Sequence, residues 1–488
     1  MKSSMPLVAL AFATIQIATV SAAPVTKGPS GTVLNVDSAW AGGVQPSSTN
    51  IAQWDSTSQA TGTTYTLGGN LSWQGIAVDN SGTTLGGVTI ANTGGFTLTL
   101  GSSGVSNNFG ANNSAGLLTL NSAIAFSADQ TWTGDKAGSI YAIVATGLID
   151  ANSKAWTKSG VGALRLSGTV SNLGSLNITG GTVSLGVGGG AGKLSSGARI
   201  ISVSSGALLE SWHTGTVLQS TDISSSAISG AGNFGKQGTG TTTLDVANTY
   251  TGTTTVGNSA GILRAGVATS AFGNNSAVSI GTSSTLDLNG YDNTIGSLTS
   301  VGNVTLGSAT LTTGGNNTTT SFSGIISGTG GLTKAGSGVF TLSGANTYTG
   351  LTTINAGAVA TGATGTFGAG NIRVNTGGTM TLGNATSIAD AANVVFDTGA
   401  TINLNFSGTE TINSLSSVSG LFATAGTNYD AGTLNGIFGG TYFTGTGLLT
   451  ITASAIPEPS TYALWLSGMA GLVVMVRRRK NRQKQPCC

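Results

Sequence analysis

An internal repeat built from short strands constrains the fold of this chain most strongly. The unit at 228–256 returns at 326–357, shifted by 98 residues, and a weaker copy lies near 154–181. Each copy contains the pattern Lys-x-Gly-x-Gly, and the lysines align at Lys158, Lys236 and Lys334. Recurrence at this length is typical of architectures in which each repeat packs only on its neighbours.

Between the copies the chain keeps one rhythm, seen at 94–100, 181–185, 284–288 and 378–382. Apolar residues alternate with Thr, Ser or Asp, while Gly and Asn mark the turns, as expected for short strands with one buried face. The sequence therefore predicts an all-β protein, a parallel β-helix or β-solenoid. The repeat spacings of 78 and 98 residues fit four and five rungs of about 19.5 residues, or three and four longer rungs.

The composition supports this prediction and excludes several other classes. Glycine accounts for 79 of the 488 residues, and only 7% are charged, so charge-paired surface helices are excluded. The hydrophobic share of 39% is too high for charge-driven disorder. The formal charge of +2 comes from basic residues at the C-terminus, which leaves no basic stripe in the body for a nucleic acid.

The N-terminus has the pattern of a secretory signal peptide over residues 1–22. Lys2 precedes an apolar run, and small residues lead to a cleavage site that we place after Ala22. We expect residues 23–100 to form an N-terminal cap and the first rungs, and residues 101–455 to form the solenoid. The body contains no cysteine, because the two in the chain are Cys487 and Cys488, so it cannot depend on disulfides.

The C-terminal segment 456–484 has three parts in a fixed order. Two prolines flank an acidic residue, an uncharged apolar segment at 461–476 follows, and a basic cluster at 477–484 would hold its end in the cytoplasm. The apolar segment is slightly short for a bilayer and is predicted to form a single transmembrane helix. The Pro-Glu-Pro motif is Pro457, Glu458 and Pro459, and the basic stop is Arg477, Arg478, Arg479 and Lys480.

This tail strongly resembles the PEP-CTERM sorting signal of Gram-negative bacteria. The resemblance implies processing near the Pro-Glu-Pro motif by exosortase, after signal peptidase has acted at the N-terminus. It also implies an inner-membrane intermediate, followed by release to the cell surface or to a biofilm matrix. A permanent membrane anchor is the alternative, and the terminal Cys487-Cys488 pair also leaves prenylation open.

The unit at 330–350 is similar to the autotransporter-associated β-strand repeat of bacterial surface proteins. The copy at 232–252 departs from it at Gly235 and Val246, and the copy at 154–174 lacks the Asn-Thr-Tyr-Thr part. The resemblance implies a right-handed β-helix rod at the cell surface. Autotransporters end in a translocator domain, whereas here the sorting tail follows residues 390–455, so we expect sorting to replace self-translocation.

The sequence also predicts where several individual residues lie. We expect Trp40, Trp54 and Trp73 to cap the first rung, with glycan stacking as the alternative. The three repeated lysines are expected to be solvated and to protect a sheet edge, with binding of anionic polysaccharide as the alternative. The lone His213 is expected in a turn or on the surface. We expect positive φ at turn positions of the best repeat, at Gly330, Gly336 and Gly350.

Catalytic chemistry finds little support in the sequence. The nearest carboxylate pairs are Asp287 with Asp292 and Asp129 with Asp135, and neither is expected beside a basic residue on an adjacent rung. We therefore predict a non-enzymatic structural or adhesin-like protein that needs no cofactor or metal. Exopolysaccharide is a possible partner. A polysaccharide lyase or hydrolase on a β-helix is the alternative.

Overall fold

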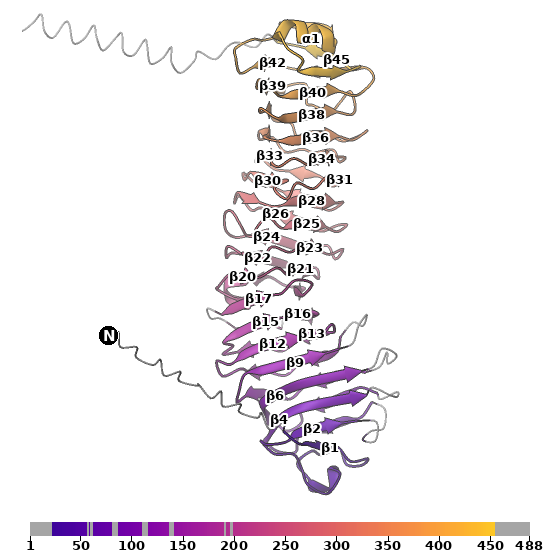
Figure 1. The fold of residues 1–488 in the computed structure, drawn as a ribbon, viewed down its shortest axis with the longest axis vertical. Helices are drawn as coiled ribbons and strands as arrows, with labels where there is room; N and C mark the ends of the chain where they lie inside the picture. Colours follow the sequence, from indigo (N-terminus) through magenta and orange to yellow (C-terminus); the bar gives the residue numbers. More distant parts are fainter. Residues whose placement is uncertain are drawn as a thin grey trace, which may run out of the picture.

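The chain folds into a long parallel β-solenoid of about 16 turns, as the sequence predicts (Figure 1). The computed structural model describes residues 22–55, 58, 62–80, 86–109, 116–135, 141–189, 192–195 and 199–453. Strands lie across the long axis and stack in chain order from the indigo N-terminal end to the yellow C-terminal end. Among the described strands the pairings are parallel, except that β43 (Gly426–Tyr429) pairs antiparallel with β45 (Leu448–Ile451).

Two sheets form the N-terminal half of the rod. The first sheet has 12 strands and the second, here called the long sheet, continues to the C-terminal end. The main path of the first sheet is β1 (Pro24–Thr26), β2 (Ile51–Trp54), β4 (Leu71–Asn80), β6 (Thr97–Phe109), β9 (Gln130–Gly134), β12 (Ala155–Ser159), β15 (Ser175–Ile178), β17 (Ile200–Val203) and β20 (Ile228–Ser229), joined at the side by β8 (Ala123–Phe126), β11 (Ile149–Asp150) and β14 (Val170–Ser171).

The long sheet contributes one strand to each successive rung. In order it comprises β3 (Thr64–Thr66), β5 (Val88–Ala91), β7 (Leu118–Leu120), β10 (Ile143–Ala145), β13 (Ala163–Leu166), β16 (Thr182–Gly189), β18 (Leu208–His213), β21 (Asn233–Gln237), β23 (Thr254–Val256), β25 (Ala277–Ile280), β28 (Ser297–Ser300), β31 (Thr320–Phe322), β34 (Val339–Leu342), β36 (Gly357–Thr361), β38 (Gly378–Leu382), β40 (Thr401–Leu404) and β44 (Phe443–Gly445).

The other faces of the C-terminal half are a 6-stranded and a 7-stranded sheet. The first comprises β19 (Val217–Leu218), β22 (Thr241–Leu244), β24 (Ile262–Ala265), β26 (Thr285–Asp287), β29 (Asn303–Thr305) and β32 (Ile326–Ser327). The second comprises β27 (Asn293–Thr294), β30 (Leu311–Thr313), β33 (Leu332–Lys334), β35 (Thr352–Ile354), β37 (Ile372–Val374), β39 (Asn393–Phe396) and β42 (Ser414–Ser417).

Alternation along each strand produces the core. In β13, Leu164 and Leu166 are buried while the residues between them face outward, and most strands repeat this pattern. One continuous apolar cluster therefore runs along the inside of the rod from Leu34 to Ile451. Burial of this column provides the main stabilisation of a body that contains no cysteine.

The predicted rung lengths are wrong, because the repeat copies do not start on the same face. Lys158 lies in β12 of the first sheet, Lys236 in β21 of the long sheet and Lys334 in β33 of the 7-stranded sheet. The spacings of 78 and 98 residues thus do not correspond to whole numbers of rungs. Paired residues on adjacent rungs are 18 apart at Thr285 and Asn303, and 29 apart at Gly75 and Gly104.

Tryptophan side chains fill the N-terminal end of the core. Trp40 follows the short 3-10 turn η1 (Asp37–Ala39), and its ring lies 5.7 Å from that of Trp54 and 5.8 Å from that of Trp73 in edge-on contacts. All three are buried, and Trp40 Nε1 donates a hydrogen bond to the Leu34 carbonyl. Burial confirms the expected packing role and excludes glycan stacking on these rings.

A second cap, which the sequence analysis did not anticipate, covers the C-terminal rungs. A long segment that contains the helix α1 (Ala431–Phe438) links β40 to β44 in the chain. The two strands themselves are neighbours, and Ile402 pairs with Phe443. Asp430 caps the helix by accepting a hydrogen bond from the Thr433 amide. Phe438 packs on Phe396 at a ring distance of 4.8 Å, which closes the open end of the core.

Candidate functional site

The repeated lysines are buried inside the solenoid, which corrects the expectation that they are solvated. The Lys158 ammonium donates hydrogen bonds to the carbonyls of Gly160 at 3.0 Å and Gly180 at 3.3 Å, where the chain turns between sheets. Lys236 and Lys334 bond equivalent corner carbonyls. Burial lowers the pKa of Lys158 and of Lys236 to about 8. These groups therefore hold corners and are not available to anionic polysaccharide.

The Asn-Thr-Tyr-Thr-Gly part of the repeat also serves the fold. The Asn248 side chain accepts from the Ile228 amide at 2.9 Å and donates to the Ala271 carbonyl at 2.9 Å, so it links three successive rungs. The Tyr250 hydroxyl bonds Thr254 at 2.7 Å inside the core. Asn346 and Tyr348 make the corresponding bonds in the second copy. The part that these two copies share is thus a structural unit.

The repeat glycines are needed for two different reasons. Gly336 has the predicted positive φ, at 64°. Gly330 and Gly350 do not, which corrects that expectation. A Cβ on Gly330 would instead lie 1.8 Å from the Ala309 carbonyl oxygen, and one on Gly350 would lie 2.3 Å from the Gly330 oxygen. These two positions require glycine because adjacent rungs approach closely there.

The single histidine lies inside the rod, not in a turn or on the surface as expected. His213 is fully buried in β18, and its Nδ1 lies 2.9 Å from the Ser211 hydroxyl, which in turn contacts Thr242 at 2.8 Å. Burial lowers the His213 pKa to about 4, so the ring is neutral at physiological pH. A Ser-His pair sealed in the core cannot reach a substrate.

The predicted carboxylate pairs are occupied by structural contacts. Asp287 forms an ion pair with Arg264 on the adjacent rung at 2.8 Å, which contradicts the expectation that no basic residue lies beside it. Asp292 accepts from the Thr310 amide, and Asp129 accepts from the Ala155 amide. In the described part of the chain, no three or more His, Cys, Asp or Glu side chains are grouped so as to hold a metal ion.

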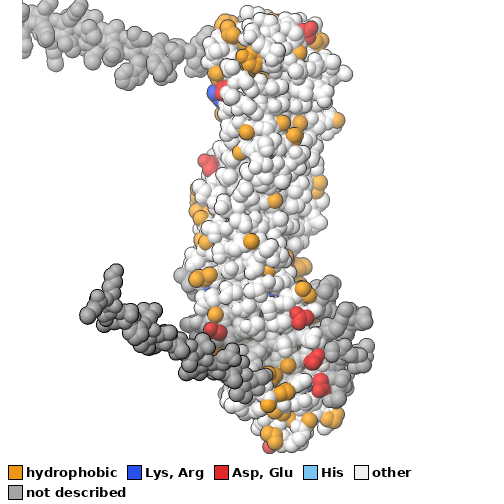
Figure 2. Space-filling model, in the orientation of Figure 1, with side chains coloured by type: hydrophobic (Ala, Val, Ile, Leu, Met, Phe, Trp, Pro, Cys, Tyr) orange, Lys and Arg blue, Asp and Glu red, His pale blue; other side chains and the backbone are white. Residues whose placement is uncertain are grey.

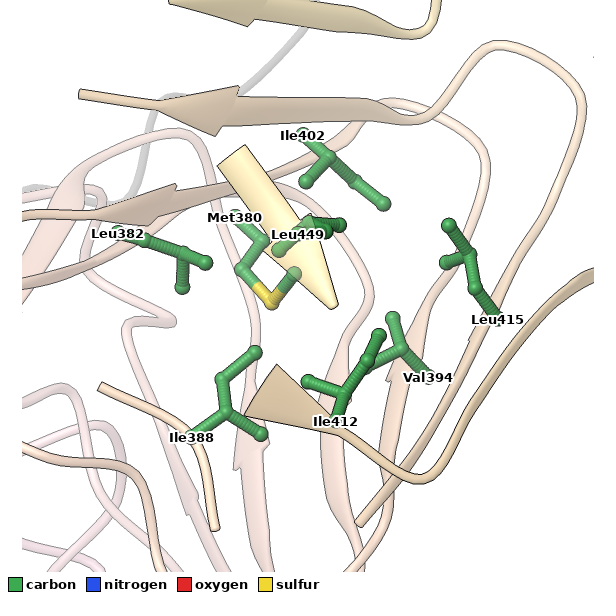
Figure 3. A pocket seen from close by; sticks show the side chains of 8 residues that line it. All are labelled: Met380, Leu382, Ile388, Val394, Ile402, Ile412, Leu415 and Leu449. Carbon is green, nitrogen blue, oxygen red and sulfur yellow. The ribbon is translucent and has the colours of Figure 1, made fainter. Parts of the chain in front are cut away.

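A cavity below the C-terminal cap is too small for a ligand. Its volume is about 10 Å³, which is room for roughly one water molecule. Figure 3 shows apolar side chains around it, among them Met380, Ile402 and Leu449. An apolar gap of this size is a packing defect of the core.

The outer face of the long sheet carries few charges, as does the side of the rod that Figure 2 shows. Residues in register along it are mostly hydroxyl residues, as in the row Thr255, Ser279 and Thr299. Toward the N-terminus the same row changes character and continues through Arg165, Ser184, Glu210 and Gly235. The two charged side chains of this row, Arg165 and Glu210, thus lie within three consecutive rungs.

The sheet is hollowed at this place. A recess of about 280 Å³ is lined by Tyr141, Val161, Ala163, Thr182, Ser184, Glu210 and Trp212. The alternation of β16 and β18 directs Ser184 and Glu210 outward, yet Ser184 is 0% and Glu210 only 7% exposed. Polar outward side chains are therefore sheltered at the base of the recess.

An acidic side chain lies in the recess and a basic side chain lies beside it. The Ser184 hydroxyl donates to the Glu210 carboxylate at 2.5 Å, and burial raises the Glu210 pKa, an effect that this bond partly offsets. The Arg165 guanidinium lies 5.3 Å from the centre of the Tyr141 ring. The recess thus holds one carboxylate and two aromatic side chains, and Arg165 packs on one of the two rings. This recess cannot be recognised in the sequence, because its residues span 141–212 and meet only through the rung register.

The predicted sorting residues lie outside the described part of the chain. This applies to Pro457, Glu458 and Pro459, to the helix at 461–476 and to the basic stop of Arg477, Arg478, Arg479 and Lys480. Ala22 is described, but nothing in the structure tests cleavage there. Within the described residues, no helix has both the length and the apolar character that crossing a membrane requires.

Comparison with known families identifies both the repeats and the tail. Residues 157–185, 234–265 and 332–360 match the family model described as passenger-associated-transport-repeat. Residues 455–480 match the model of the PEP-CTERM protein-sorting motif. Both resemblances are confirmed. The three passenger-associated transport repeats include the buried lysines, and the PEP-CTERM match spans the Pro-Glu-Pro motif and the first arginines.

One curated relative resembles a segment of the chain. The adhesin BmaC autotransporter of Brucella suis biovar 1 (strain 1330) is 41% identical over 141 residues. The alignment covers 28% of this chain and only 4% of the adhesin, so the likeness concerns a segment. No solved structure matches the chain.

Proposed function

We propose that the protein is an exported, non-enzymatic surface protein of a Gram-negative bacterium, with an adhesin-like or structural role. The observation that carries this proposal is the combination of a PEP-CTERM sorting motif with a solenoid built on passenger-associated transport repeats. The similarity to a segment of an autotransporter adhesin supports it further. In this proposal signal peptidase cleaves after Ala22, and an exosortase processes the tail before release to the surface or matrix.

The structure adds a physical argument. Each repeated side chain described above bonds a corner carbonyl, links rungs or fills the core, so the repeats supply length and not chemistry. A long rod with few surface charges is suited to extending binding surfaces away from a cell. The body thus acts as a spacer and scaffold.

The Glu458→Ala variant tests the sorting route. The apolar segment and the basic stop are unchanged, so insertion into the inner membrane should proceed while processing fails. Cell fractionation with an antibody against the body should then show accumulation in the inner membrane with the tail attached. Normal surface release of Glu458→Ala with an intact tail would refute exosortase processing.

A matched variant separates processing from membrane orientation. Replacing Arg477, Arg478 and Arg479 with glutamine should disturb retention and orientation before cleavage. Mass spectrometry of the mature C-terminus distinguishes the two outcomes. Identical behaviour of the two variants would show that the motif has no role of its own.

The enzymatic alternative has a direct test. The purified body is incubated with neutral and acidic polysaccharides, and the products are assayed for new reducing ends and unsaturated sugars. We expect neither. Their appearance would replace the structural proposal with a lyase or hydrolase.

A further inference from the structure

The recess on the long sheet interrupts an otherwise regular hydroxyl row. Two of its lining residues, Ser184 and Glu210, lie in register on consecutive rungs, and Gly235 takes the same position on the next rung, beside the recess. Gly235 is one of the positions at which this repeat copy differs from the best one, which has Thr333 there. A Cβ on Gly235 would lie 3.2 Å from the Glu210 Cβ and 3.8 Å from its Oε2. The missing side chain thus leaves the carboxylate open on one flank.

The size of the recess restricts its occupant. A volume of about 280 Å³ is close to the lower limit of small-molecule sites, roughly 300 Å³. It can accept one or two ring-sized groups but not a folded partner. It also opens to solvent along the side of the rod, so a ring in it can belong to a longer chain.

The lining combines apolar faces with hydrogen-bonding groups. Trp212 and Tyr141 offer aromatic surfaces, which pack against the C–H faces of a ring. The Glu210 carboxylate accepts hydrogen bonds, and the Thr182 hydroxyl donates or accepts them. A ring with apolar faces and a rim of hydroxyl groups matches both kinds of surface.

The charges favour a ligand without net charge. An acidic ligand would approach the buried Glu210 carboxylate, and a cation would approach the Arg165 guanidinium that already lies over the Tyr141 ring. Either would meet a like charge in a poorly solvated site. A neutral ligand avoids both penalties.

We propose that this recess is a binding subsite for a neutral carbohydrate, with one sugar ring against Trp212 and its hydroxyl groups hydrogen-bonded to Glu210 and Thr182. This inference rests on the proposed surface location, because a polysaccharide chain must reach the side of the rod. Among the described residues that line the recess, Glu210 is the only carboxylate. Glycoside hydrolysis ordinarily uses a pair of them, so the site binds and does not cleave.

The test uses the full-length mature protein and a defined panel of probes. Neutral gluco-, manno- and galacto-oligosaccharides are compared with alginate oligosaccharides and with choline by isothermal titration calorimetry. The part of the tryptophan fluorescence change that Trp212→Ala abolishes gives a second signal. We expect at least one neutral oligosaccharide to bind, with neither alginate nor choline competing for it.

Two variants and one control locate the binding. Trp212→Ala should weaken binding at least about tenfold, because it removes the stacking surface. Gly235→Thr restores the residue of the best repeat and should weaken binding similarly by filling the flank of Glu210. Tyr291→Ala, which removes a 41% exposed aromatic side chain far from the recess in sequence and outside its lining, should leave binding unchanged.

Defined outcomes overturn the inference. Failure of every neutral oligosaccharide to bind, binding that survives both Trp212→Ala and Gly235→Thr in folded protein, or selective binding of alginate or choline would each do so. Melting temperature establishes that the variants are folded, and Gly235→Thr remains informative if Trp212→Ala is not. Surface fractionation of Trp212→Ala cells should be normal, so failure of sugar binding is distinguished from failure of export.

Discussion

The ammonium groups of Lys158, Lys236 and Lys334 occupy the inside of rung corners, where several backbone carbonyls converge. A carbonyl buried without a donor is costly, and lysine reaches it from the strand interior while its apolar stem packs in the core. Sequence reasoning placed these lysines in solvent because isolated charges are rarely buried. These lysines are exceptions because backbone carbonyls converge on each ammonium group at a corner, and this arrangement is seen only in the structure.

Removing a corner lysine should therefore destabilise the rod. Lys158→Met keeps the length and the apolar stem but leaves the Gly160 and Gly180 carbonyls without their charged donor. We expect the free energy of unfolding to fall by about 2–3 kcal/mol, measured by denaturant titration. Lys154→Met, four residues away and only partly buried, is the control and should change stability by less than about 0.5 kcal/mol. Equal effects would contradict the corner role.

Glu410 gives the stability a pH dependence. It is buried, its carboxylate accepts from the Ser387 amide at 2.6 Å, and burial raises its pKa from 4.5 to about 7. The folded state thus binds more protons than the unfolded state between pH 4.5 and 7, so the Glu410 contribution is present below pH 4.5 and is lost as the pH rises to 7.

The measurement compares wild type with Glu410→Gln across this range. The stability of wild type relative to the variant should fall by roughly 2–3 kcal/mol from pH 4.5 to 7. The comparison is needed because His213, with its pKa lowered to about 4, adds the opposite slope in both proteins between pH 4 and 6.5. A pH-independent difference would show that Glu410 is not protonated on folding.

At the scale of the element, adjacent rungs differ in length but keep their corners in register. Gly330 follows β32 and lies against Ala309 of the previous rung, so its lack of a side chain sets the separation of two turns. The sequence identified the strands and the turn glycines from their alternation. It could not distinguish glycines required for a positive φ from glycines required for the close approach of two rungs, because both requirements select glycine.

A valine at Gly330 should be strongly destabilising even though its φ is not positive. Its Cβ would lie 1.8 Å from the Ala309 carbonyl oxygen, so two rungs must separate. We expect a loss of about 2–3 kcal/mol, followed by thermal unfolding. Gly215→Val is the control, because nothing lies within 4 Å of a Cβ at this exposed turn. Unchanged melting of Gly330→Val would mean that the rung contact is misplaced.

At the scale of the whole molecule, the alternation and the repeat predicted the solenoid and its continuous core. They did not predict the C-terminal cap, because a short helix between β40 and β44 leaves little periodic signal. The recess was also missed, since its side chains come from strands whose register the sequence does not reveal. Chemistry that depends on contacts between rungs is thus the part least accessible from sequence.

The rod should fold without metal or disulfide. The body contains no cysteine, and its stability derives from the apolar column. Circular dichroism of the body, from 23 to 455, should show a β spectrum that is unchanged by chelator and reductant. A large loss of signal with chelator would reveal a structural ion.

The stacking of rungs also determines how the molecule would respond to tension between its ends. Pairing bonds run along the axis from one rung to the next, so a pull on the C-terminal cap peels β45 first and then each rung in turn. The first rung to detach spans 39 residues from Thr409 to its partner Leu448, and each later rung of 18 to 29 residues releases roughly 60 to 100 Å of extended chain. Single-molecule pulling should record successive steps of this size, and a single rupture would contradict it. A tether built in this way lengthens under load before it breaks.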